Sequence, residues 1–149
     1  MTAIATEYTF DAFIQKQFMP YSGRNRRFFD VAKNIAFSSI FPDYRHGAIL
    51  VSGGKIYNYS CNKNNFCSFG NRFRKKNKGR ATMHAELGAI LGLDRSITSG
   101  SSVYVARISK NGNFLISKPC EMCYLAMKHV GVKKVFYSID DNRCGYYKL

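Results

Sequence analysis

Two short motifs constrain this chain more than any other feature: His-Ala-Glu at 84–86 and Pro-Cys-Glu-Met-Cys at 119–123. Zinc favours imidazole and thiolate ligands, and a catalytic zinc site has three protein ligands and one open position for water. His84, Cys120 and Cys123 supply those three ligands. Glu86 is two residues beyond the histidine, where its carboxylate can transfer protons without binding the metal. The fold must therefore bring the two motifs together.

The composition is that of one packed domain covering residues 1–149, with a hydrophobic fraction of 46%. No apolar run approaches the ~20 residues needed to cross a bilayer, so we expect no membrane partner. The first seven residues lack the basic start and the long apolar stretch of a secretory signal. The sequence thus predicts a protein of the cytoplasm, in a reducing compartment.

The five cysteines favour metal chemistry over disulfides, because the number is odd and two of them form a C-x-x-C motif. We expect Cys61, Cys67 and Cys144 to be free thiols. A thioredoxin-like redox motif would leave the His-Ala-Glu motif without a purpose. A structural zinc site would take a fourth ligand from Cys61 or Cys67, but it would leave Glu86 idle.

The charge balance restricts the partners of the protein. Lys and Arg number 23 against nine Asp and Glu, a formal charge of +14, and such a surface attracts polyanions or anionic small molecules. It does not distinguish a nucleotide from a nucleic acid, because both carry phosphate. The densest basic run, 72–80, would reach the mouth of the pocket in the fold proposed below, where phosphate binding and a merely solvated loop are equally supported.

Hydrophobic periodicity and turn residues predict the order of the elements. We expect helices at 10–19, about 25–40, 83–93 and 119–130, strands at 47–51, 55–60, 102–108, 133–139 and 146–149, and an exposed loop at 62–82. Helices that alternate with strands after a hairpin indicate an α/β protein. The predicted fold is a three-layer α-β-α sandwich around a mixed sheet of about five strands, with the metal ligands on two helix starts.

From the strand at 47–51 to about residue 139, the motifs and the element order resemble the cytidine/deoxycytidylate deaminase superfamily, which includes tRNA adenosine and polynucleotide cytidine deaminases. The resemblance implies a cytidine deaminase-like fold with Zn²⁺ bound by the three ligands above and Glu86 as the proton carrier. It further implies four substrate contacts: the backbone N–H of Ala85 at the base, Asn62 at the sugar, and Ser117 and Pro119 beside the metal. Lys118 is a departure, because many members that act on nucleotides have a glutamate there.

The implied activity is hydrolytic deamination of a cytosine nucleoside or nucleotide, with dCMP the specific candidate, and the resemblance also implies a homo-oligomer. Two alternatives remain open. One is a base deaminase acting on RNA or single-stranded DNA, which the charge of +14 favours. The other is a catalytically dead fold used as a binding module, against which Glu86 argues. His46 is expected to be an ordinary residue at a strand edge, and His129 a surface residue.

Overall fold

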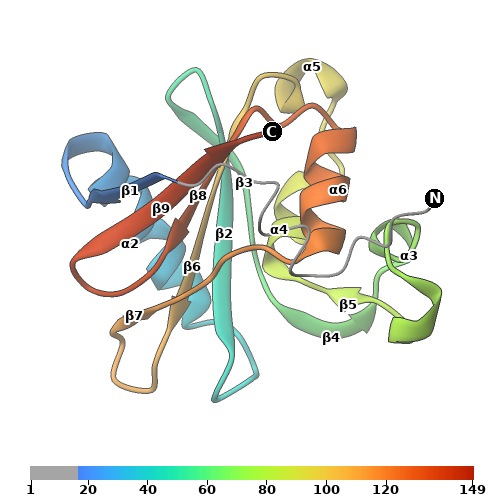
Figure 1. Cartoon of the computed structure of the whole chain (residues 1–149), viewed down its shortest axis with the longest axis horizontal. Coiled ribbons are helices and arrows are strands. Elements are labelled where there is room, and N and C mark those ends of the chain that lie inside the picture. Colours follow the sequence, from blue (N-terminus) through green and yellow to red (C-terminus); the bar gives the residue numbers. More distant parts are fainter. Residues whose placement is uncertain (1–16) are drawn as a thin grey trace.

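The computed structural model describes residues 17–149, and the elements within that range are strands interspersed with helices (Figure 1). In chain order they are β1 (Gln17–Pro20), α2 (Gly23–Ala36), β2 (Arg45–Ser52), β3 (Lys55–Cys61), β4 (Lys63–Phe66), α3 (Ser68–Asn71), the short 3-10 helix η1 (Lys76–Lys78), β5 (Thr82–Met83), α4 (Ala85–Ile90), α5 (Arg95–Thr98), β6 (Ser102–Ile108), β7 (Phe114–Leu115), α6 (Glu121–His129), β8 (Lys134–Ser138) and β9 (Arg143–Lys148).

A mixed sheet forms the middle of the molecule, in the order β1-β9-β8-β6-β2-β3, with β7 paired to β6. Among the strands of residues 17–149, only β6 and β8 are hydrogen-bonded in parallel. The α/β class is confirmed, but the sheet has seven strands and not about five. The additional strands are β1 and β7. Each is so short that its hydrophobic pattern does not identify it, and pairing with a distant strand is what orders it.

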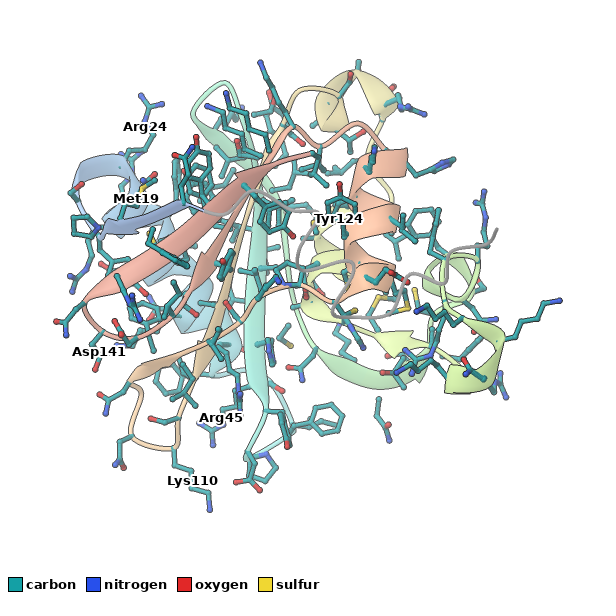
Figure 2. All side chains as sticks on the ribbon, in the orientation of Figure 1. Met19, Arg24, Arg45, Lys110, Tyr124 and Asp141 are labelled. Atoms are coloured by element: carbon teal, nitrogen blue, oxygen red, sulfur yellow. The ribbon has the colours of Figure 1, made fainter. Side chains whose placement is uncertain are left out.

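Helices cover both faces of the sheet (Figure 1). On one face α2 packs on β2 and β6, and buries Phe28, Phe29 and Ala32 in an aromatic cluster. On the other face lie α4 and α6, which contact each other. Tyr124 of α6 is buried there, close to Tyr147 of β9, with a ring separation of 5.9 Å (Figure 2). This second core supports the two predicted metal motifs.

The strand directions explain why the two motifs meet. Both β3 and β6 run antiparallel to β2, so they point the same way. The chain leaves β3 and reaches α4, and it leaves β6 and reaches α6. Helices that follow strands of one direction begin at the same edge of a sheet, which is where α/β proteins place their sites. The starts of α4 and α6 therefore come together.

Two sequence predictions are corrected at the N-terminal end. Most of the helix expected at 10–19 lies outside the described residues, but Gln17–Pro20 is strand β1, whose backbone pairs with the edge of β9. The next helix was expected at about 25–40, yet α2 ends at Ala36. Ile40, at the end of the expected range, is 72% exposed. The helical spacing of this residue is therefore a coincidence of sequence.

The segment expected to be an exposed loop, residues 62–82, contains ordered elements. Strands β4 and β5 form a small second sheet, and α3 and η1 lie between them. Cys67 is buried and caps α3, where its Sγ accepts a hydrogen bond from the Gly70 N–H at 3.3 Å. Cysteine is not among the residues that mark a helix N-cap in a sequence, so the sequence did not predict α3. The basic residues remain on the outside of the segment.

Candidate active site

The three predicted metal ligands form one cluster. His84 is the N-cap of α4, Cys120 is the N-cap of α6, and Cys123 lies in the first turn of α6. Their ligand atoms all lie within 4.8 Å of one another. His84 Nδ1 is 3.3 Å from the sulfur of Cys123 and 3.7 Å from that of Cys120. The fold thus joins residues that are 36 and 39 positions apart.

These separations fit zinc. A tetrahedral centre with Zn–N of about 2.1 Å and Zn–S of about 2.3 Å places ligand atoms roughly 3.5–3.8 Å apart, so the 3.7 Å pair matches and the 3.3 Å pair needs to open only slightly. The set of one imidazole and two thiols also suits zinc, and three ligands leave one position open. Among the described residues, neither Cys61 nor Cys67 belongs to this group. A structural site with a fourth cysteine is therefore excluded for the residues that the structure describes.

Protonation of the two sulfurs is coupled. A hydrogen bond with Cys123, and then His84, lowers the pKa of Cys120 to about 4, although burial opposes the shift. The hydrogen bond with Cys120 and burial raise the pKa of Cys123. One proton is consequently shared between two sulfurs beside an imidazole. A divalent cation can replace that proton, since metal binding to thiols releases protons.

Glu86 lies within one turn of His84 and is buried, with 5% of its surface exposed. Burial raises the pKa of its carboxyl group, because the charged form loses its hydration. Two pockets adjoin the metal cluster. Glu86 lines the larger one, together with His84 and Cys120. A carboxyl group with a raised pKa that lines a pocket beside a metal site is suited to accept and return protons.

The larger pocket has a volume of about 360 Å³, within the range of small-molecule sites. Its wall combines the metal-site residues with others from β2 and the loop before it, from the start of β4, from β5, and from the segment that leads into α6. The lining residues are Phe41, Tyr44, His46, Asn62, Lys63, Thr82, Met83, His84, Ala85, Glu86, Ser117, Lys118 and Cys120. Three of the four predicted substrate contacts are thus in the wall. The fourth, Pro119, is buried next to Cys120.

Two of the residues predicted to contact substrate, Asn62 and Ser117, form hydrogen bonds within the protein through their side chains. Asn62 Oδ1 accepts a hydrogen bond from the His46 N–H at 3.0 Å, and Asn62 Nδ2 donates to the Tyr44 carbonyl at 2.6 Å. The Ser117 hydroxyl donates to the Val105 carbonyl at 2.8 Å and lies 2.8 Å from the Ser138 hydroxyl. Both side chains therefore hold segments of the pocket wall in place.

His46 lies in the pocket wall, a position that the sequence did not favour for it. Its Nδ1 is 3.3 Å from the Tyr44 carbonyl, and burial lowers the pKa of its imidazole to about 4. The imidazole is therefore neutral at pH 7. The nearby Asn62 was the available signal, because a residue that opens one strand faces a residue that closes its hairpin partner.

The basic run does not line the larger pocket, whose cations are Lys63 and Lys118. Arg74, Lys75 and Lys78 instead line a neighbouring pocket of about 240 Å³ that also includes His84 and Cys120. The run was expected at the mouth of the substrate pocket, but it reaches the metal cluster from the side of this second pocket. His129 is exposed, as expected, and its ring lies 5.3 Å from that of Phe73.

Residues 23–139 match the family model of the cytidine and deoxycytidylate deaminase zinc-binding region. The chain belongs to this family. The match spans α2 to the end of β8 and contains all three metal ligands and Glu86. Membership of this family supports zinc-dependent deamination of the cytidine type as the general activity. No curated protein matches the chain at a significant level.

The family assignment agrees with the deaminase resemblance on fold and cofactor. The His84, Cys120 and Cys123 group fits the Zn²⁺ of this family. Within residues 17–149, no helix is long and apolar enough to cross a membrane.

Proposed function

We propose that this deaminase converts the cytosine base of a nucleoside or nucleotide to uracil, with dCMP as the specific substrate. The observation that carries the proposal is the buried Glu86 carboxyl group beside the three-ligand cluster, in the wall of a pocket of nucleoside size. A structural metal site or a binding module does not need a buried acid at that position. The desolvation cost of such a carboxyl group indicates catalytic use.

In the proposed reaction, water adds its oxygen to C4 of cytosine, the bond from C4 to the exocyclic nitrogen breaks, and ammonia leaves. Zinc, when bound, supplies a Lewis acid that lowers the pKa of water toward ~7. Glu86 accepts the first proton of water and delivers it to N3, then accepts the second from the hydroxyl group formed on C4 and delivers it to the leaving nitrogen. The N–H of Ala85, at the start of α4, would donate to the carbonyl edge of the base. Water and cytosine are consumed and uracil and ammonia are formed, so the atoms balance.

Two features of the larger pocket support a nucleotide. Phe41, Tyr44 and Met83 provide apolar surface for a base and a sugar, and Lys63 and Lys118 provide positive charge at the same pocket. A lysine ammonium group attracts a phosphate without demanding a fixed geometry. Lys118, which stands where many family members have a glutamate, thus has a function in attracting the phosphate. It favours a phosphorylated substrate over a free nucleoside.

The proposal is tested by incubating the zinc-loaded protein with deoxycytidine, dCMP, cytidine and adenosine, and measuring ammonia release and the oxo product by mass. We expect dCMP to be converted with the highest kcat/KM. Glu86→Gln should lower kcat by about 10²–10⁴-fold with unchanged zinc content, since general acid–base catalysis contributes that much. Asp30→Asn, an exposed residue of α2, is the control for loss of one negative charge. Full turnover by Glu86→Gln would contradict the mechanism.

A second candidate function is deamination of single-stranded nucleic acid, which the charge of +14 and the 60% exposed Tyr44 ring beside the pocket favour. Salt separates the two functions. The logarithm of polynucleotide affinity should fall with the logarithm of salt concentration, by ~0.7 per phosphate contacted. The KM for dCMP, with its single phosphate, should change far less. Conversion of dCMP without conversion of oligonucleotides selects the first function.

A further inference from the structure

A second pocket adjoins the metal cluster and has no role in the deamination described above. Its volume is about 240 Å³, and it shares only His84 and Cys120 with the larger pocket. Its remaining lining residues are Phe73, Arg74, Lys75, Lys78, Glu121 and Met122. Three of these are cations and one is an acid. The metal cluster is therefore a common wall between a pocket of mixed character and a basic pocket.

Contacts within the protein hold two of the basic residues that line this second pocket. The guanidinium group of Arg74 donates to the Lys78 carbonyl from Nε at 3.3 Å and from Nη2 at 3.0 Å, which closes the turn at 74–78. Arg74 Nη1 also lies 3.8 Å from the sulfur of Met122 on α6. Lys75 Nζ is 3.5 Å from a Glu121 carboxylate oxygen, so a second contact joins the turn to α6. The side chains of Arg74 and Lys75 are thus held beside the pocket.

The chemistry of this pocket is that of a phosphate site. One acid faces three cations, and Arg74 and Lys75 already hold protein groups at 74–78 and on α6. An anion with several oxygens can add bonds to all three cations, and charge-assisted bonds to phosphate are among the stronger hydrogen bonds. Phe73 and Met122 supply apolar surface beside it. A neutral ligand would leave the excess positive charge uncompensated.

We propose that this pocket binds a second phosphate of the substrate, one that is not the phosphate adjacent to the larger pocket. The inference rests on the proposed deaminase function, because it takes the target base to occupy the larger pocket. The shared chemistry is a phosphate group reached across His84 and Cys120. It belongs either to a nucleoside polyphosphate or to the neighbouring unit of a single strand. In both cases the enzyme would accept, in addition to dCMP, a substrate that carries at least one more phosphate.

The test compares Lys78→Glu with Lys76→Glu. Both residues lie in η1 and are exposed, but only Lys78 lines the pocket, so the two variants change the net charge equally. The substrates are deoxycytidine, dCMP, dCTP and a short oligonucleotide with one cytosine. We expect Lys78→Glu to lower kcat/KM for dCTP or for the oligonucleotide about tenfold more than Lys76→Glu does, with deoxycytidine unaffected by either. Loss with dCTP identifies a polyphosphate, and loss with the oligonucleotide identifies a strand.

A binding measurement keeps the inference testable even if no substrate is deaminated, an outcome that would overturn the proposed function alone. Inorganic tripolyphosphate is titrated into each zinc-loaded variant by calorimetry. The dissociation constant should be about tenfold higher for Lys78→Glu than for Lys76→Glu. Equal effects of the two variants, on binding and on every substrate, would show that only general surface charge acts and would overturn the second phosphate site.

Discussion

At the scale of the residue, the pocket depends on a neutral imidazole in a positively charged protein. His46 Nδ1 lies 3.3 Å from the Tyr44 carbonyl, and a carbonyl only accepts, so Nδ1 carries the proton. The other ring nitrogen, Nε2, then has the lone pair of a hydrogen-bond acceptor. Asn62 fixes both ends of this arrangement through the backbone of Tyr44 and His46. A substrate hydroxyl would therefore find an acceptor in a wall otherwise rich in donors.

We predict that His46 stays neutral far below the usual pH of histidine titration. Burial lowers its pKa from 6.5 to about 4, so the unfolded chain binds more protons than the folded one between these values. Its contribution to stability is complete above about pH 6.5 and is lost as the pH falls toward 4. An NMR titration of the imidazole resonances of the zinc-loaded protein measures the pKa directly.

Assignment of the His46 resonances comes from their absence in His46→Gln, which keeps a polar group of similar reach. In that variant the free energy of unfolding should decline less steeply between pH 6.5 and 5 than in the wild type. A half-titration of His46 near pH 6.5 would show that the pocket is more hydrated than its burial indicates.

At the scale of the element, the position of α4 depends on a close approach to β3. A methyl group on Gly88 would overlap the hydroxyl of Ser60, so no larger residue fits there. Asn58 Nδ2 lies within hydrogen-bond distance of the carbonyls of Ala89 and Leu91, at 3.0 and 3.3 Å, and so fixes the end of the same helix. Because α4 carries His84 at its start, these contacts set the distance from the histidine to the cysteines of α6.

Gly88→Ala should therefore disturb the metal cluster without touching it. Overpacking costs about 1–3 kcal/mol of unfolding free energy, and displacement of α4 should weaken zinc binding. Zinc content after dialysis and thermal unfolding are the measurements. The double variant with Ser60→Gly removes the overlapping hydroxyl and should recover zinc binding. If Gly88→Ala alone retains full zinc affinity, then α4 is not held by this contact.

At the scale of the whole molecule, the metal cluster joins two parts of the core. His84 comes from the α4 side and the two cysteines come from α6, which the chain reaches only after β6 and β7. A metal at this junction adds a link between elements that otherwise touch through apolar side chains. The stability of the molecule should thus depend on zinc.

Removal of zinc should lower the free energy of unfolding by about 3–4 kcal/mol, the stabilisation expected at zinc concentrations ~100 to ~1000 times the dissociation constant. Thermal unfolding before and after treatment with a chelator, followed by addition of zinc, measures the change and its reversal. His84→Ala lacks one ligand and is the control, in which the chelator should have little further effect. An unchanged unfolding midpoint of the wild type after chelation would show that zinc at the cluster does not stabilise the fold.

Residue types and their spacing in the chain predict the donor set, the proton carrier and the class of fold. Ligand choice depends on residue type, and the spacing of His84, Glu86, Cys120 and Cys123 is visible in the chain. The hairpin of β2 and β3 and the strands β6 and β8 were also predictable, because each has an apolar run bounded by turn residues. These features are local, so a linear pattern contains them.

Which residues surround the metal cluster depends on contacts between segments that are distant in the chain. Strand β1, the small β4–β5 sheet and the burial of Cys67 depend on hydrogen bonds between distant segments, which no local pattern encodes. The position of His46 in the pocket wall is an intermediate case, because the predictable hairpin of β2 and β3 brings it close to Asn62 while distant segments complete the wall. The separation of the basic run from the larger pocket also follows from the contacts of Arg74 and Lys75 with distant groups. Residue types fixed the chemistry, and long-range pairing fixed the side from which a substrate approaches it.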